Sequence, residues 1–160
     1  MTSRIQFLLF LASLVLSPLV VTPRAQAQST TPAEIFVVLA KEEPGTIDPA
    51  LADMGALRRP PFNAFRSMTI LERDDIRLRE GEPQEVTLPN GRKMRILLQR
   101  VMPDGRFRLR VSIKREEGNS YLPLLQVVAS PGDPFFVAGQ AHEGGTLVIG
   151  IRVGQAPPRQ

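Results

Sequence analysis

The side chains that most often perform acid, base or nucleophilic chemistry are scarce in this chain of 160 residues. It contains no cysteine, one tyrosine and one histidine, His142. An imidazole can act as a general base or bind a metal, but either role needs further groups held beside it. Ser120 and Ser130 are too distant along the chain for the sequence to connect them with His142. We therefore expect His142 to be a solvent-exposed residue of a flexible loop at 140–145.

Glu72, Asp74 and Asp75 form the only tight acidic cluster. Carboxylates at alternate positions can bind calcium, but the glycine and the distal glutamate of a calcium loop are missing at their places. Because Arg73 and Arg77 lie among these acids, we expect a solvated turn. No pair of carboxylates stands out for glycoside hydrolysis. The sequence thus predicts no catalytic residue, no metal site and no cofactor, and it leaves open whether the protein is an enzyme.

A stripe of basic residues alternates with apolar ones in the segment 106–114, and its candidate surface residues are Arg106, Arg108 and Arg110. Such a stripe can bind an anionic glycan, a lipid headgroup or an acidic partner, and it can also serve only to keep the surface soluble. In either register of the neighbouring strand, Arg95 or Arg100 would lie beside it.

Aromatic residues provide the second candidate surface. Phe62 and Phe65 lie in the proline-stiffened segment 60–65, and Phe135 and Phe136 open a short apolar strand. These four residues are the predicted protein interface. The alternative is that Phe62 and Phe65 belong to a covering loop that plugs the edge of the fold.

The elements that must position these residues are strands. Pro-Asn-Gly at 89–91 and Pro-Asp-Gly at 103–105 are similar turn signals, in which glycine takes the left-handed position of a hairpin loop. They predict a three-stranded antiparallel meander over 84–88, 93–102 and 107–115. A three-residue loop would pair Val101 with Phe107 and a two-residue loop would pair Met102 with Phe107, so the register of the middle strand stays open.

The remaining apolar segments predict further strands, separated by Pro- and Gly-rich turns. Pro123 indicates an edge strand or a bulge, and Gly150 leaves room for a neighbouring backbone. One short helix, at most 50–58, is expected after a cap at Asp48. The expected fold is all-β, a single antiparallel β-sandwich or small barrel built on the meander. The further strands are expected at 35–39, 68–71, 76–79, 121–129, 135–138 and 146–153.

The N-terminal 27 residues are typical of a cleavable secretory signal, with an apolar stretch over 5–21 and small residues at Ala25 and Ala27. We divide the chain into the signal peptide (1–27), an N-terminal strand with a Pro-rich covering segment (28–66), the β-sandwich core (67–154) and a disordered tail (155–160). Removing Arg4 and Arg24 with the signal leaves 18 basic and 16 acidic residues, a net charge of +2. This small charge and the export signal disfavour a nucleic-acid partner.

Several segments together resemble a group of short exported β proteins of Gram-negative bacteria. The likeness runs through Pro-Pro-Phe-Asn-Ala-Phe at 60–65, Leu-Pro-Asn-Gly-Arg at 88–92, Phe-Phe-Val-Ala-Gly-Gln at 135–140 and Gly-Gly-Thr-Leu-Val-Ile at 144–149. It covers most of the chain after the signal. The resemblance implies a periplasmic or extracellular setting and assigns no role to any residue.

From these features we expect an exported, non-enzymatic binding or adaptor module of the cell envelope. A role as an accessory to a larger envelope or secretion assembly is one option. Its partner would be an envelope protein, and no transmembrane segment would remain after cleavage near Ala27. The alternatives are an exported hydrolase that uses His142 or a carboxylate pair, and a glycan-binding or inhibitor-like domain. The oligomeric state is left open.

Overall fold

A computed structural model describes residues 29–154, so the predicted signal peptide and the predicted tail lie outside the described residues. Two short 3₁₀ helices, η1 (Gly55–Arg58) and η2 (Phe62–Ala64), follow one short α-helix, α1 (Pro49–Ala52). The strands are β1 (Thr31–Lys41), β2 (Ser67–Leu78), β3 (Pro83–Thr87), β4 (Lys93–Val101), β5 (Phe107–Lys114), β6 (Tyr121–Ala129), β7 (Phe135–His142) and β8 (Gly145–Val153).

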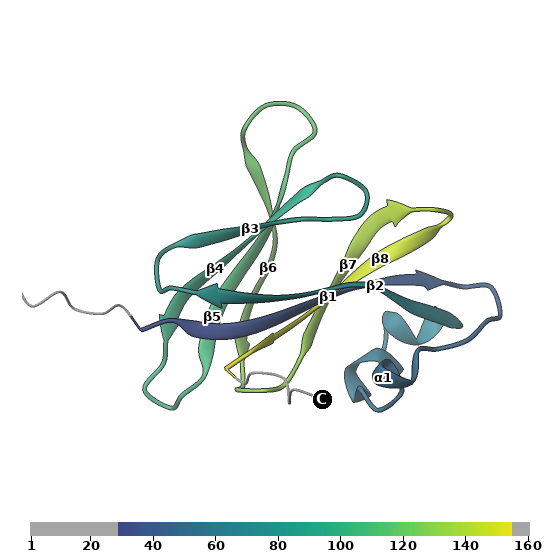
Figure 1. The fold of residues 1–160 in the computed structure, drawn as a ribbon, viewed down its shortest axis with the longest axis horizontal. Coiled ribbons are helices and arrows are strands. Elements are labelled where there is room, and N and C mark those ends of the chain that lie inside the picture. Colours follow the sequence, from purple (N-terminus) through teal and green to yellow (C-terminus); the bar gives the residue numbers. More distant parts are fainter. Residues whose placement is uncertain (1–28, 155–160) are drawn as a thin grey trace, which may run out of the picture.

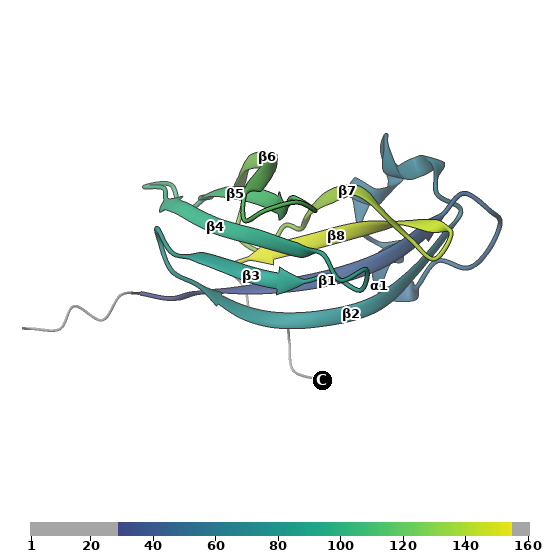
Figure 2. The same ribbon diagram turned by 90° about the horizontal axis from the view of Figure 1, so that it is seen from above.

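The strands form two four-stranded sheets, in the orders β2-β1-β8-β7 and β3-β4-β5-β6, in which all neighbours are antiparallel. The prediction of an all-β sandwich is confirmed, and the described sheets do not close into a barrel. Strands β3 to β6 lie toward one end of the long strands β1 and β2, and the short helices lie toward the other (Figure 1). Figure 2 shows the same arrangement from above.

Strand β1 lies in the middle of its sheet, between β2 and β8. Its side chains alternate between two apolar clusters. Ile35 and Val37 belong to the main core between the sheets, whereas Phe36 and Val38 belong to a second cluster on the outer face. The N-terminal strand therefore belongs to the sandwich. The helical segment, residues 47–65, packs on the outer face of the sheet that contains β1.

The meander has the predicted turns. Gly91 and Gly105 have φ values of 79° and 81°, in the left-handed region that favours glycine. The three-residue loop is the one observed, because Val101 pairs with Phe107. A bulge at Gln99 then interrupts the β4–β5 ladder, so that Leu98 pairs with Leu109 and Arg100 pairs with Arg108.

Strand β2 differs from the prediction. Residues 68–71 and 76–79 were expected to be separate strands joined by a solvated acidic turn, but β2 runs without a break from Ser67 to Leu78. Backbone pairing with β1 over the whole length, with one bulge opposite Val37 and Val38, outweighs the low β-propensity of the acids. The acids remain exposed on an edge strand, where charged side chains discourage pairing with other chains.

Strand β6 is also an edge strand, as Pro123 predicted. Its ladder with β5 shifts beside Pro123, which pairs with Ser112 while Leu125 pairs with Val111. Within residues 29–154, none of the helices has the length and apolar character needed to cross a membrane.

Candidate functional site

The four predicted interface phenylalanines are all half-buried, but they do not form one surface. Phe62 and Phe136 contact each other edge to face, with ring centroids 5.8 Å apart. Phe65 packs against the same outer cluster. Phe135 packs against the main core, because successive residues of a strand point to opposite faces. The structure therefore brings Phe62, Phe65 and Phe136 to one cluster and separates Phe135 from them.

This aromatic cluster rests on a row of three paired residues across β1, β8 and β7. Phe36 is opposite Gly150, and Gly150 is opposite Phe136. A Cβ atom at Gly150 would lie 2.1 Å from the Phe36 ring, so only glycine admits that ring. The room predicted at Gly150 is thus filled by a side chain and not by a neighbouring backbone. Phe36 and Phe136 then meet edge to face, at 5.7 Å between centroids.

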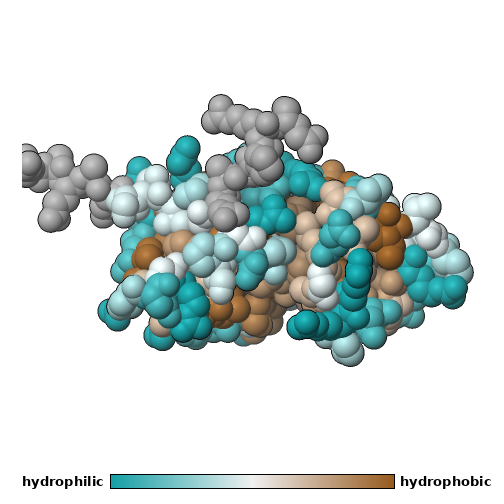
Figure 3. Space-filling model, turned by 90° about the horizontal axis from the view of Figure 1, so that it is seen from below, coloured by the Kyte–Doolittle hydropathy of each residue, from teal (hydrophilic) through white to brown (hydrophobic). Residues whose placement is uncertain are grey.

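A pocket of about 210 Å³ opens between the helical segment and the start of β2. We call it the anchor pocket. Its base is buried, because Leu51 is 2% exposed and Leu57 5% exposed, while Ile47 at its mouth is 46% exposed. Figure 3 shows apolar surface toward the end of the molecule that carries the helical segment. The lining residues are Ile47, Leu51, Ala52, Leu57, Arg58, Asn63, Phe65 and Met68.

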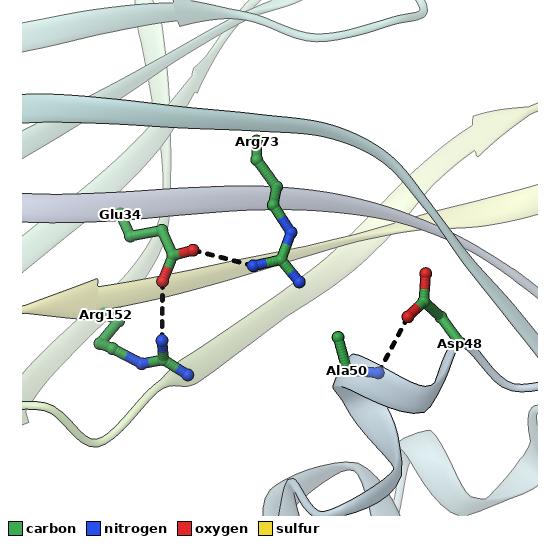
Figure 4. Close-up of polar contacts among 5 residues, drawn as sticks. All are labelled: Glu34, Asp48, Ala50, Arg73 and Arg152. Atoms are coloured by element: carbon green, nitrogen blue, oxygen red, sulfur yellow. Dashed lines mark hydrogen bonds and ion pairs between the residues drawn. The ribbon is translucent and has the colours of Figure 1, made fainter. Parts of the chain in front are cut away.

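The walls of the anchor pocket are fixed by backbone and capping hydrogen bonds. The Asp48 carboxylate accepts from the Ala50 amide at 2.9 Å and caps α1, as predicted (Figure 4). The Asp48 amide donates to the Met68 carbonyl at 2.8 Å, and the Met68 amide donates to the Thr46 carbonyl at 3.0 Å. The helical segment is therefore tied to β2 on the side where the pocket opens.

A buried carboxylate lies on the same outer face. Glu34 is 4% exposed and accepts from Arg73 at 3.0 Å and from Arg152 at 2.7 Å (Figure 4). Both guanidinium groups lie 5.9 Å from the centre of the Phe36 ring. Two cations and two charged hydrogen bonds compensate the cost of burying this carboxylate. Sequence reasoning missed the group, although a lone acid that precedes an apolar run was a visible signal.

Arg152 also lines a larger cleft of about 610 Å³ beside the helical segment. Asp53 and Asp133 face this cleft together with Arg59 and Arg152, so acidic and basic groups balance there. This arrangement selects neither an anion nor a cation.

The predicted basic stripe is divided by the structure. Arg106 is neutralised by Asp104, with 2.7 Å between its Nε and the carboxylate, and the two bonds from Arg106 lower the pKa of Asp104. Arg108 lies opposite Arg100, and Arg110 lies opposite Leu97. The sequence had left open whether Arg95 or Arg100 would lie beside the stripe, and the bulge at Gln99 places Arg100 opposite Arg108.

A polar cluster on the outer face of the sheet β3-β4-β5-β6 joins β3, β4 and β6. Glu85 accepts hydrogen bonds from the Tyr121 hydroxyl and, at 2.8 Å, from Arg95, whose guanidinium lies 3.7 Å from the centre of the Tyr121 ring. These bonds lower the pKa of Glu85 to about 2, and the hydrogen bond from Tyr121 has the largest effect. The bond to Glu85 in turn raises the pKa of Tyr121. The Glu85 carboxylate therefore stays charged over the ordinary pH range.

His142 is the last residue of β7, not part of a flexible loop, because the β7–β8 ladder continues to the pair of His142 and Gly145. Its side chain is 17% exposed, and its Nε2 lies 3.8 Å from the carboxylate of Glu143, the next residue. Among residues 29–154, no three His, Cys, Asp or Glu side chains converge as metal ligands would.

The chain was compared with protein-family models, with curated proteins and with solved structures, and none of the three comparisons found a match.

Proposed function

We propose that this protein is an exported, non-enzymatic binding or adaptor module of the bacterial cell envelope, and that a protein partner binds at the anchor pocket. The observation that carries the proposal is the combination at this pocket of a rigid frame with an exposed apolar mouth. Ile47 leaves 46% of its surface open to solvent beside the half-buried Phe65.

The size of the pocket favours a side chain over a small-molecule ligand. Ligand sites usually enclose about 300–1,000 Å³. The anchor pocket encloses about 210 Å³, which suits one large apolar side chain. Protein interfaces concentrate their affinity in a few such anchors, each seated in a packed, desolvated pocket.

The rim of the pocket is polar, as the rim of a protein interface usually is. Asn63 and Arg58 line it beside the apolar base. Arg58 donates to the carbonyl of Ala52, which holds its guanidinium at the edge of the pocket. A partner would therefore meet hydrogen-bonding groups around an apolar centre.

Filling the pocket tests the proposal without removing any of the apolar side chains at its base. Ala52 is exposed and lines the anchor pocket, whereas Ala56 is also exposed but lines the larger cleft. A photo-crosslinking residue at position 47 is introduced into the wild type, Ala52→Leu and Ala56→Leu, and crosslinked products from cells are identified by mass spectrometry.

We expect one stoichiometric protein partner in the wild type and in Ala56→Leu. In Ala52→Leu the affinity for that partner falls about 30-fold, the value of one interface anchor. Equal crosslinking in both variants would place the partner elsewhere on the molecule. Absence of any crosslinked protein would remove the support for an adaptor.

A further inference from the structure

The outer face of the sheet β3-β4-β5-β6 carries three arginines that lack the compensation found around them. Within residues 29–154, neither Arg100, Arg108 nor Arg110 forms an ion pair. Four other basic residues of this sheet and its turns do have acidic partners, namely Arg95 and Lys93 with Glu85, Arg92 with Glu116, and Arg106 with Asp104. Lys114 and Arg115, at the far end of β5, also form no ion pair with a described residue. We call Arg100, Arg108 and Arg110, which are neighbours in the β4–β5 ladder, the arginine face.

The arginine face is built at an energetic cost. Arg100 and Arg108 lie directly opposite each other, and like charges in that position destabilise a sheet. The bulge at Gln99 creates this pair, since strict alternation after the buried Leu98 would turn Arg100 toward the core. Arg110 follows Arg108 on the same side of β5. Positive charge is therefore concentrated across β4 and β5, at Arg100 and Arg108, and along β5, at Arg108 and Arg110.

Apolar side chains lie among these cations. Val128 on β6 is opposite Arg108 and is 40% exposed, and Leu97 is opposite Arg110 and half-buried. Guanidinium groups beside one exposed and one half-buried apolar side chain fit the boundary between lipid headgroups and acyl chains. A soluble polyanion would be bound by the arginines but would gain little from Val128.

We propose that the arginine face docks onto anionic lipid headgroups at a bilayer surface. The anchor pocket lies beside β2 and the helical segment, so the two surfaces belong to different sheets, and those parts of the molecule lie toward opposite ends of β1 and β2 (Figure 1). A membrane and a protein partner can therefore be bound at the same time. The membrane proposal does not depend on the proposed partner, because it rests on different residues.

The test is co-sedimentation of the protein, as isolated from its cells, with vesicles of phosphatidylcholine alone or with about one third phosphatidylglycerol. The variant is Arg108→Gln/Arg110→Gln. The matched control is Arg66→Gln/Arg77→Gln, which removes the same charge from two exposed arginines at the other sheet. Arg66 directly precedes β2, and Arg77 lies on it. Residues outside 29–154 are common to all variants and contribute equally.

We expect Arg108→Gln/Arg110→Gln to weaken partitioning onto anionic vesicles about 20-fold, and the control to weaken it far less, because surface charges act within about 10 Å. Val128→Ser should weaken it about threefold, through lost apolar contact. Circular dichroism checks that each variant is folded.

Two results would overturn the proposal. Equal losses in the two double variants would mean attraction by net charge alone. Binding to soluble dextran sulfate as tight as to anionic vesicles, and unaffected by Val128→Ser, would identify the ligand as a polyanion and not a membrane.

Discussion

The aromatic ring of Phe36 on β1 occupies the space in which Gly150 on β8 would carry a Cβ atom. This contact lets the ring lie across the sheet, where it supports Phe136 and lies beside the guanidinium groups of Arg73 and Arg152. The absence of a side chain at Gly150 thus allows the Phe36 ring to contact both Phe136 and the two guanidinium groups that pair with Glu34.

Gly150→Ala should destabilise the fold by about 1–3 kcal/mol, because the added methyl group forces the buried Phe36 ring to move. Urea unfolding followed by circular dichroism measures the change. Gly55→Ala is the control, since nothing lies within 4 Å of a Cβ there and the backbone accepts alanine. A similar loss in both variants would contradict the packing argument.

Glu34→Gln should cost about 2 kcal/mol of stability, because it leaves two guanidinium groups without their shared carboxylate. The cost stays below that of a fully buried pair, since the Arg73 side chain is 44% exposed and the Arg152 side chain 23% exposed. Glu72→Gln, at an exposed position of β2, should change stability by less than about 0.5 kcal/mol. The idea fails if the two substitutions have the same effect.

Glu85 should titrate with a pKa of about 2 in the folded protein, against an ordinary value of 4.5. Because the unfolded chain then binds this proton more readily, the contribution of Glu85 to stability is complete above pH 4.5 and is lost as the pH falls toward 2. Tyr121→Phe should raise the pKa toward 4.5 by removing its largest cause. The titration of the carboxyl carbon by nuclear magnetic resonance measures the shift.

Lys93→Gln is the control for this titration. The Lys93 ammonium lies 3.7 Å from the Glu85 carboxylate and lowers its pKa less than the Tyr121 hydroxyl does. We therefore expect a smaller rise in pKa. If Tyr121→Phe leaves the Glu85 pKa at about 2, the hydrogen bond from Tyr121 is not its cause.

Leu51→Ala should release the helical segment without unfolding the sandwich. Leu51 is the buried residue of α1, and the segment contacts the sheet through few other buried side chains. The amides of Leu51, Met54 and Leu57 should then exchange hydrogen faster, while those of β1 and β8 stay protected. Equal acceleration in all of them would show that segment and sandwich unfold together.

The local features of this chain could be read from its sequence. Proline, asparagine or aspartate, and glycine marked both hairpin loops, Asp48 marked the start of α1, and Pro123 marked an edge strand. Each rests on the conformational limits or hydrogen bonding of a few adjacent residues. Strict alternation also gave the two faces of β5, and it would have separated Phe135 from Phe136 had it been applied to β7.

The candidate surfaces depended on contacts between distant residues. Glu34 meets Arg73 and Arg152, which lie 39 and 118 residues further along the chain. The bulge at Gln99 brings Arg100 opposite Arg108, and the packing of the helical segment on β2 forms the anchor pocket. By itself the sequence determined the strands, the turns and the solvent face of β5, because those follow from local backbone preference and side-chain period. Only the tertiary structure decided which charges are compensated and which apolar groups stay open, because strand order and ladder register arise from packing the whole core.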